Sequence, residues 1–173
     1  ETFEILWKSS LCVIKSSSKG LITSFKYTNA KNFSEGLAAV EFQDKWGFVD
    51  MNGKEVIPIQ YEDANSFSYG LAGVQLNGKW GFINIEGNHI IPFKYDDVYD
   101  FFGSFAIFEL NEKYGLIDML GNEIVDAKYD FISVVSDGLI LVENEMKYGY
   151  IDEKGKIVIP LIYDYADQLN FLS

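Results

Sequence analysis

Apolar and polar positions alternate along short segments of the chain, and the same alternation returns every 34 residues. In residues 37–42 the side chains at positions 38, 40 and 42 are apolar, whereas position 41 carries Glu41. One, two and three periods later these columns are again mostly apolar, with Gln or Glu at the fourth. Because a period of two is typical of a half-buried β-strand, the pattern predicts this strand in four successive units.

An aromatic residue followed by glycine marks the next strand of each unit. A lysine precedes each pair, and another glycine follows seven residues after each aromatic. Self-similarity at this period indicates a repeat architecture, in which an atypical terminal unit is expected to act as a cap. The pairs are Trp46-Gly47, Trp80-Gly81, Tyr114-Gly115 and Tyr148-Gly149. We therefore interpret residues 1–173 as a single array of five units: 1–34, which is degenerate, 35–68, 69–102, 103–136 and 137–173.

Turn-forming residues separate the predicted strands. A first hairpin is expected at Asp44-Lys45 and, one period later, at Asn77-Gly78, which is a strong hairpin signal. Residues 50–53 run from Asp to Gly, as type I turns prefer. The third strand is expected to stop at Pro58, because proline cannot donate a ladder hydrogen bond. Each unit is thus predicted to be a three-stranded meander followed by an irregular segment, 61–68 in the second unit.

The repeated pattern resembles the WG-containing repeat family of largely bacterial proteins. It reads Lys-Trp-Gly, then two apolar residues, Asp or Asn, Gly, Ile-Pro and Tyr-Asp or Tyr-Glu. The resemblance covers nearly the whole chain and departs from the pattern at Tyr114, Tyr148, Asp126 and the first unit. It implies a β-rich repeat module, and it supplies no general catalytic residues.

An all-β fold follows from these observations. Units of about 34 residues cannot bury a core alone, so we expect five three-stranded meanders stacked as an open β-solenoid or superhelix. A small, closed, five-bladed propeller-like ring is the alternative. The eight residues of the aromatic-glycine pairs are expected to form the structural core of the repeat. Trp46 would act as a wedge between repeats, and Gly47 would let an aromatic ring of the neighbouring unit approach the backbone.

Charge and composition exclude several classes of partner. The 14 basic residues are all lysine, and 26 acidic residues give a net charge of −12. Such a surface repels phosphate backbones and anionic lipids, so neither nucleic acid nor a membrane is an expected partner. No apolar run approaches the length of a membrane span. Cys12, the only cysteine, lies among apolar residues and is expected to be buried.

The sequence offers weak candidates for metal binding or catalysis. Turn residues Asp50, Asn52, Asp118 and Asp152 superficially suggest calcium, but the spacing lacks the distal ligands of a calcium loop. Asp96-Asp97 could form the acid and base of a glycoside hydrolase only if a cleft brought them together correctly. His89 is expected at the surface. We therefore expect no metal site, no cofactor and no enzyme activity.

The most promising functional feature is an acidic-aromatic run in each unit, and a regular array would place such runs in a row. We expect this ladder to bind a basic or polar protein or peptide, which makes the chain a non-catalytic scaffold module. A carbohydrate-binding module is the alternative, and a hydrolase is less favoured. Because the chain begins at Glu1, an upstream segment removed by processing is possible, and a secreted or cell-surface location is favoured over the cytoplasm. The ladder consists of Tyr61, Glu62, Asp63, Tyr95, Asp96, Asp97, Tyr129, Asp130, Tyr163 and Asp164.

Overall fold

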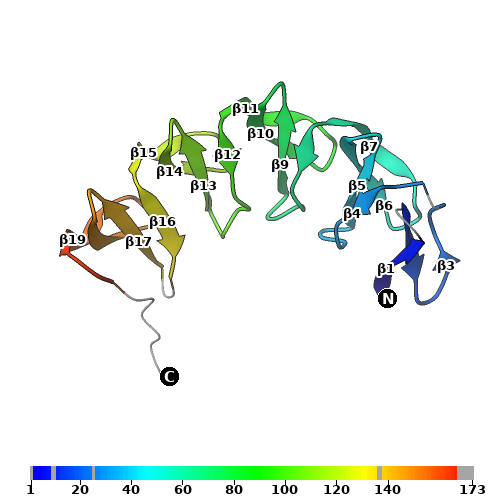
Figure 1. The fold of residues 1–173 in the computed structure, drawn as a ribbon, viewed down its shortest axis with the longest axis horizontal. Coiled ribbons are helices and arrows are strands. Elements are labelled where there is room, and N and C mark those ends of the chain that lie inside the picture. The colour runs from blue at the N-terminus through cyan, green and yellow to red at the C-terminus, as the bar shows by residue number, and fades with distance from the viewer. Residues whose placement is uncertain (1, 9–10, 25, 136–137, 167–173) are drawn as a thin grey trace. The chain divides into compact units, whose positions relative to one another are not determined.

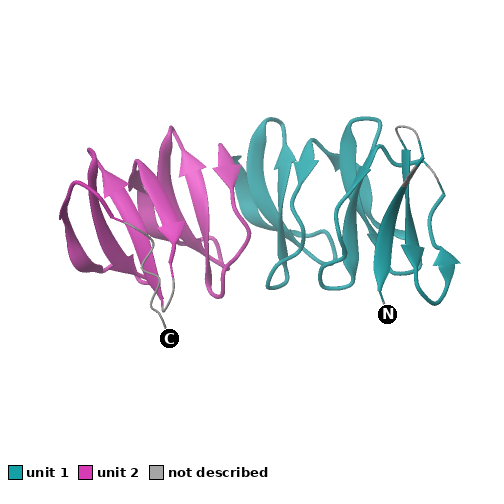
Figure 2. Ribbon diagram, turned by 60° about the horizontal axis from the view of Figure 1, so that its bottom comes forward, with its two compact units in different colours: residues 1–94 teal, residues 95–173 magenta. Residues whose placement is uncertain are grey.

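The computed structural model describes residues 2–8, 11–24, 26–135 and 138–166. All regular secondary structure in these ranges is β-strand, and the strands form five sheets in chain order. Among the described residues, no helix is long and apolar enough to span a membrane. The chain divides into two compact units, residues 1–94 (unit 1) and 95–173 (unit 2), which Figure 2 colours separately. The predicted all-β repeat fold is confirmed, with one sheet for each repeat.

Unit 1 contains three antiparallel sheets, in which strands adjacent in sequence are also adjacent in the sheet (Figure 1). The first sheet consists of β1 (Phe3–Lys8), β2 (Leu11–Ser16) and β3 (Gly20–Leu21). The second consists of β4 (Asn29–Ala30), β5 (Leu37–Phe42), β6 (Lys45–Asp50) and β7 (Glu55–Tyr61). The third consists of β8 (Asp63–Ala64), β9 (Leu71–Leu76), β10 (Lys79–Asn84) and β11 (His89–Tyr95).

Unit 2 contains two further sheets of the same topology. The fourth sheet consists of β12 (Asp97–Val98), β13 (Phe105–Leu110), β14 (Lys113–Asp118) and β15 (Glu123–Tyr129). The fifth consists of β16 (Phe131–Val134), β17 (Leu139–Asn144), β18 (Lys147–Asp152) and β19 (Ile157–Tyr163). Within each unit the sheets stack one after another in an open row (Figure 2).

The structure adds a short first strand to the predicted three-stranded meander. In the third sheet, Asp63 pairs with Gln75 and Ala64 pairs with Val74. These two residues lie in the segment that the sequence predicted to be irregular, because two ladder pairs are too few to produce a visible alternation. Each four-stranded sheet therefore begins shortly before a predicted unit boundary, while the 34-residue period is unchanged.

Two-residue hairpin turns join the second and third strands of these sheets. Both residues have positive φ at Gln43-Asp44 (51° and 58°) and at Asn77-Gly78 (53° and 72°), as a type I′ turn requires. The predicted turn at Asp44-Lys45 was one residue too late, since Lys45 belongs to β6 and pairs with Phe42. The equivalent turn in the fifth sheet, Glu145-Met146, reaches φ values of 50° and 59° without a glycine.

In the second, third and fifth sheets the last strand does not stop at proline, as the sequence predicted, but passes through it. Phe48 pairs with Ile57 and Trp46 pairs with Tyr61, so a step of two residues in β6 faces a step of four in β7. Pro58 lies inside this bulge on an edge strand, where no donated ladder bond is needed. The bulge lets the strand resume after the proline.

The glycine of each aromatic-glycine pair lies beneath this bulge. A Cβ atom on Gly47 would lie 2.7 Å from the Ile57 carbonyl oxygen and 2.8 Å from the Cα of Ile59. The equivalent distances to carbonyl oxygen are 2.6 Å at Gly81, 2.5 Å at Gly115 and 2.6 Å at Gly149. The expectation that glycine makes room for a neighbouring unit's aromatic ring was therefore wrong. The space is needed by the backbone of the same sheet, because the bulged edge strand folds over the glycine.

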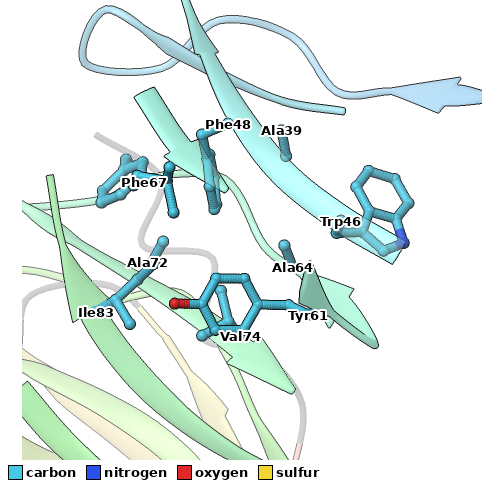
Figure 3. Packing of buried hydrophobic residues seen from close by; sticks show 10 residues of the cluster. Ala39, Trp46, Phe48, Tyr61, Ala64, Phe67, Ala72, Val74 and Ile83 are labelled. Atoms are coloured by element: carbon cyan, nitrogen blue, oxygen red, sulfur yellow. The ribbon is translucent and has the colours of Figure 1, made fainter. Parts of the chain in front are cut away.

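Within each unit, apolar side chains between consecutive sheets form the core. Between the second and third sheets, the rings of Phe48 and Phe67 lie 4.9 Å apart in a buried cluster (Figure 3). Trp46 is buried at the edge of this cluster, as its predicted role between repeats requires. The cluster joins Ala39, Trp46, Phe48, Ile57 and Tyr61 to Ala64, Phe67, Ala72, Val74 and Ile83.

The degenerate first sheet keeps the register of the others. Cys12 occupies the tryptophan column and forms a bridge with Tyr27, just as Trp46 pairs with Tyr61. The predicted burial of Cys12 is confirmed, because its side chain is inaccessible to solvent, and burial raises the pKa of its thiol. The first sheet therefore covers the second with an apolar face, although it lacks the repeat's aromatic-glycine pair.

Asp or Asn side chains stabilise the turns that join the last two strands of each four-stranded sheet. Asp50 Oδ1 accepts hydrogen bonds from the amides of Asn52 (2.8 Å) and Lys54 (2.9 Å). Burial by itself would raise the pKa of Asp50, but these amides outweigh it and hold the pKa below its ordinary value. Asn84, Asp118 and Asp152 accept the equivalent bonds. These side chains are therefore engaged in the turn chemistry that the sequence predicted.

A first prediction concerns the strained hairpin turn of the fifth sheet. Met146 is exposed with a φ of 59°, in the column that holds Gly78 in the third sheet. A left-handed conformation costs a non-glycine residue about 1–2 kcal/mol. We expect Met146→Gly to raise the free energy of unfolding by about 0.5–1 kcal/mol, measured by denaturant titration. Gly78→Ala should lower it, and two changes of the same sign would contradict the turn assignment.

A second prediction concerns the glycine beneath the bulge. Gly81→Ala places a Cβ within 2.6 Å of the Ile91 carbonyl oxygen, a backbone atom that cannot rotate away. We expect the free energy of unfolding to fall by about 2–3 kcal/mol, as overpacking typically costs. The control is Gly70→Ala, which meets nothing within 4 Å and bears only the cost of its positive φ. Equal losses in thermal denaturation would show that contact with β11 is not the cause.

A third prediction concerns the turn carboxylates and pH. Burial alone would raise the pKa of Asp118, but hydrogen bonds from Asn122 and Leu120 hold it below its ordinary value of 3.8. A lowered folded-state pKa stabilises the protein above the unfolded pKa, and this stabilisation disappears as the pH falls through the folded pKa. Asp118→Asn should therefore lower stability by about 1 kcal/mol at neutral pH and by less below pH about 3. Urea unfolding of both proteins across this range would contradict the prediction if the difference were constant.

Candidate binding surface

Three of the four tyrosines in the predicted ladder are buried. The exposed fraction is 0% for Tyr61 and Tyr95 and 4% for Tyr129, whereas Tyr163 is 50% exposed. The Tyr95 hydroxyl donates to Glu123 at 3.4 Å, and burial raises the pKa of Tyr129. Tyr61 and Tyr129 lie in the apolar clusters between consecutive sheets of unit 1 and unit 2, respectively. The buried tyrosines are therefore core residues, which corrects the expectation that a partner would contact them.

Two predicted carboxylates of the ladder belong to the short strands. Asp63 Oδ1 accepts a hydrogen bond from the Ala64 amide at 2.7 Å, and Asp97 Oδ1 accepts one from the Val98 amide at 2.8 Å. Asn29 makes the same contact with Ala30 at 2.9 Å. These hydrogen bonds stabilise the short first strands of the second, third and fourth sheets, so Asp63 and Asp97 contribute to the fold.

The remaining carboxylates of the ladder accept hydrogen bonds from hairpin-turn amides or pair with lysines. We call the end of each sheet that carries the type I′ turn its hairpin end. In unit 1, Glu62 lies 3.7 Å from Lys45 of the second sheet and accepts from the Gly78 amide of the third at 2.7 Å. In unit 2, Asp96 accepts from the Asn111 amide at 2.7 Å.

Asp130 makes the same double contact within unit 2. Its carboxylate pairs with Lys113 of the fourth sheet and accepts from the Glu145 amide of the fifth at 2.9 Å. The Lys113 ammonium, followed by the Glu145 amide, holds the pKa of Asp130 below its ordinary value. Asp164 pairs with Lys147 and is otherwise exposed. We call Glu62, Asp96, Asp130 and Asp164 the acidic column. Within each unit, Glu62 and Asp130 join consecutive sheets, and the column also carries negative charge at the surface.

Aromatic rings from a different column accompany these acids. Tyr114 pairs across the sheet with Glu109, and Tyr148 pairs with Glu143. Burial, the Glu109 carboxylate and the hydroxyl of Tyr99 raise the pKa of Tyr114. The Glu143 carboxylate raises the pKa of Tyr148, and burial adds to it. The predicted ladder did not include Tyr114, Tyr148, Tyr99 or the two glutamates. Glu109 and Glu143 could have been found from the sequence, because they lie in the column of Glu41, which carries Glu or Gln in four units.

The charge of the protein is concentrated in unit 2. Residues 1–94 contain nine lysines and ten acidic residues, a net charge of −1. Residues 95–173 contain five lysines and 16 acidic residues, a net charge of −11. The hairpin end of unit 2 thus lies in a strongly negative field and combines carboxylates with half-buried tyrosines.

The hairpin end of unit 2 presents carboxylates and tyrosine rings among the described residues. Within the described ranges, no group of three or more His, Cys, Asp or Glu residues is placed to hold a metal ion. His89 is exposed, as expected, with its ring edge-on to Phe93 at 4.8 Å. What the hairpin end of unit 2 can do is attract cationic groups and give them flat apolar rings to pack against.

Comparisons with solved structures find distant likenesses. A Kluyveromyces lactis Hsv2 with loop 6CD replaced by a Gly-Ser linker is 10% identical, with 76% of this chain and 50% of that chain covered and a TM-score of 0.45. A second structure of Kluyveromyces lactis Hsv2 is also 10% identical, with coverages of 68% and 42% and a TM-score of 0.42. This chain therefore spans half or less of the Hsv2 chains.

A third structure is described as "The de novo evolutionary emergence of a symmetrical protein is shaped by folding constraints". It is 8% identical, with 87% of this chain and 86% of that chain covered and a TM-score of 0.38. No curated protein matches the chain.

The sequence itself matches a family model, described as WG containing repeat, five times in succession. The matched segments are 17–46, 46–80, 80–114, 114–147 and 148–170. They follow one another almost without a gap, and four of them begin at the aromatic residue of an aromatic-glycine pair. Because these matches cover most of the sequence, the chain belongs to the family of WG-containing repeat proteins.

Proposed function

We propose that this chain is a non-catalytic binding module, which holds a basic segment of a protein or peptide against the hairpin end of unit 2. The observation that carries the proposal is the concentration of charge: unit 2 has a net charge of −11, against −1 for unit 1. A field of that size raises the local concentration of cationic partners and speeds their association.

The protonation states at the hairpin end suit a cationic partner. Lys113 and the Glu145 amide keep the Asp130 carboxylate charged well below neutral pH. The hydroxyls of Tyr114 and Tyr148 are neutral at neutral pH, as tyrosine ordinarily is, and their pKa values are raised further, so each can donate or accept a hydrogen bond. The surface therefore offers fixed negative charge beside neutral aromatic rings, a combination that attracts lysine and arginine side chains.

Glu109 and Glu143 are the residues to test. Both pair across the sheet with a tyrosine of the hairpin end, and each carboxylate raises the pKa of that tyrosine. Asp96 and Asp97 are poorer choices, because each accepts a hydrogen bond from a backbone amide. A substitution there that loses this hydrogen bond would disturb the fold as well as the surface charge. The double variant Glu109→Gln with Glu143→Gln removes two charges and keeps the shape of both side chains.

We expect an oligolysine peptide to bind the protein at low ionic strength and to bind the double variant several-fold more weakly, measured by titration calorimetry. The control is Asp126→Asn with Glu153→Gln, which removes the same charge from exposed positions of unit 2. Screening should weaken binding as salt rises above about 0.1 M, where the Debye length is about 10 Å.

Equal weakening in the two double variants would contradict a localised surface, because total charge would then explain the binding. Absence of oligolysine binding at low salt would contradict the proposal outright. Binding to a neutral oligosaccharide with no salt dependence would instead support the carbohydrate-binding alternative.

A further inference from the structure

The second sheet places one of the chain's own lysines over an aromatic ring. The Lys31 ammonium lies 5.4 Å from the centroid of the Trp46 ring, which is within the range of a cation–π contact. Trp46 pairs across the strands with Glu41, and Glu41 pairs with Asn29. An ammonium group thus lies over a ring that has one carboxylate beside it in the sheet. The side chains at positions 29, 31 and 41 together carry no net charge.

The fourth sheet repeats this arrangement with a tyrosine in place of the lysine. Tyr99 stands two periods after Lys31, and the backbone amides of both donate to the neighbouring strand at equivalent positions. Tyr114 replaces Trp46, and its hydroxyl forms hydrogen bonds with Tyr99 and with the Glu109 carboxylate. Tyr99 is 47% exposed, and Tyr114 and Glu109 are half-buried. Two rings and a carboxylate therefore meet where the second sheet has a ring, a carboxylate and a cation.

The fourth sheet also places two carboxylates directly opposite each other, because Asp97 pairs with Glu109. Like charges at directly opposite positions destabilise a sheet. The equivalent pairs in the other four-stranded sheets contain a single carboxylate: Asn29 with Glu41, Asp63 with Gln75, and Phe131 with Glu143. Positions 97, 99 and 109 carry two negative charges and no positive one. A cation beside this pair would relieve the repulsion between its carboxylates.

The two lysines between residues 97 and 129 are engaged with other groups. Lys113 pairs with Asp130, and the Lys128 ammonium lies 5.2 Å from the centroid of the Tyr129 ring. The second contact shows that a tyrosine ring of the fourth sheet accepts a lysine at about the distance found over tryptophan. The chemistry of this sheet therefore suits a lysine ammonium that comes from another molecule.

Four neighbouring side chains make up what we call the fourth-sheet cluster: Asp97, Tyr99, Glu109 and Tyr114. We propose that this cluster binds one lysine side chain of the basic partner, whose ammonium takes the role that Lys31 has in the second sheet. The inference rests on the proposed function and deepens it, because it assigns one side chain of the partner to one set of residues. In the complex, the ammonium lies against the tyrosine rings and directs its N–H donors at the two carboxylates.

A first test gives the fourth sheet a lysine of its own. In Tyr99→Lys, the introduced ammonium should occupy the cluster, as Lys31 occupies its place over Trp46. We expect this variant to bind an oligolysine peptide at low ionic strength several-fold more weakly than the control Leu120→Lys, measured by titration calorimetry. The control adds the same charge to the same sheet, at an 81% exposed position in the turn opposite the hairpin end. Circular dichroism establishes that both variants are folded.

A second test separates binding from stability. Asp97→Asn copies the Asn29–Glu41 pair, and Asn29 accepts the hydrogen bond from the following amide at 2.9 Å, as Asp97 does at 2.8 Å. We expect a higher melting temperature, because the repulsion from Glu109 is removed, together with several-fold weaker binding of oligolysine. Asp126→Asn removes the same charge from an exposed position of the same sheet and should change both quantities less. A residue with a purely structural role would not give a gain in stability together with a loss of binding.

Failure of this site and failure of the proposed function give different results. If oligolysine binds the unmodified protein and Tyr99→Lys weakens binding no more than Leu120→Lys, the lysine site is wrong and the proposed function stands. Lower stability of Asp97→Asn with unchanged binding would also overturn the site. If oligolysine does not bind the unmodified protein at low salt, the proposed function itself is wrong, and the lysine site is wrong with it.

Discussion

A sheet built from one repeat must have its faces covered by other sheets. Thirty-four residues supply strands for a single sheet, and a single small sheet cannot exclude water from both of its sides. The faces are therefore complementary. Phe48 and Ile57 project from one sheet against Ala72 and Val74 of the next, so large side chains meet small ones. The rest of the architecture serves this stacking.

The aromatic-glycine pair contributes by shaping the edge of each sheet. The bulge around Pro58 folds the edge strand over Gly47 and brings Tyr61 opposite Trp46. Both aromatic residues are then buried toward the following sheet. The absence of a Cβ atom at Gly47 is a local constraint. It allows the bulge that places Trp46 and Tyr61 against the side chains of the following sheet.

The acidic column shows how one residue can serve both structure and surface chemistry. Asp130 joins two sheets of unit 2 through a lysine and a backbone amide, and it remains partly exposed at the hairpin end. Because the structural contacts also keep it ionised, stability and surface charge have the same origin. The charge differs sharply between the units, since unit 1 balances its carboxylates with lysines and unit 2 does not.

The sequence by itself determined the 34-residue period, the all-β class and the turns that run from Asp or Asn to Gly, because these depend on residues close together in the chain. Alternation at positions 37–42 and the Asp50 turn are local signals of this kind. The proline bulge could not be predicted in this way. Pro58 alone indicates the end of a strand, and only pairing of Tyr61 with Trp46 reveals that the strand continues.

The binding surface was only partly predictable for the same reason. Periodicity placed Tyr61, Tyr95 and Tyr129 in equivalent positions, but it could not tell which way the rings face. Tertiary structure decided that these three tyrosines are buried, and that Tyr114 and Tyr148 pair with acidic residues instead. Burial depends on which sheet lies against a face, and that is a property of the assembled array rather than of any one repeat.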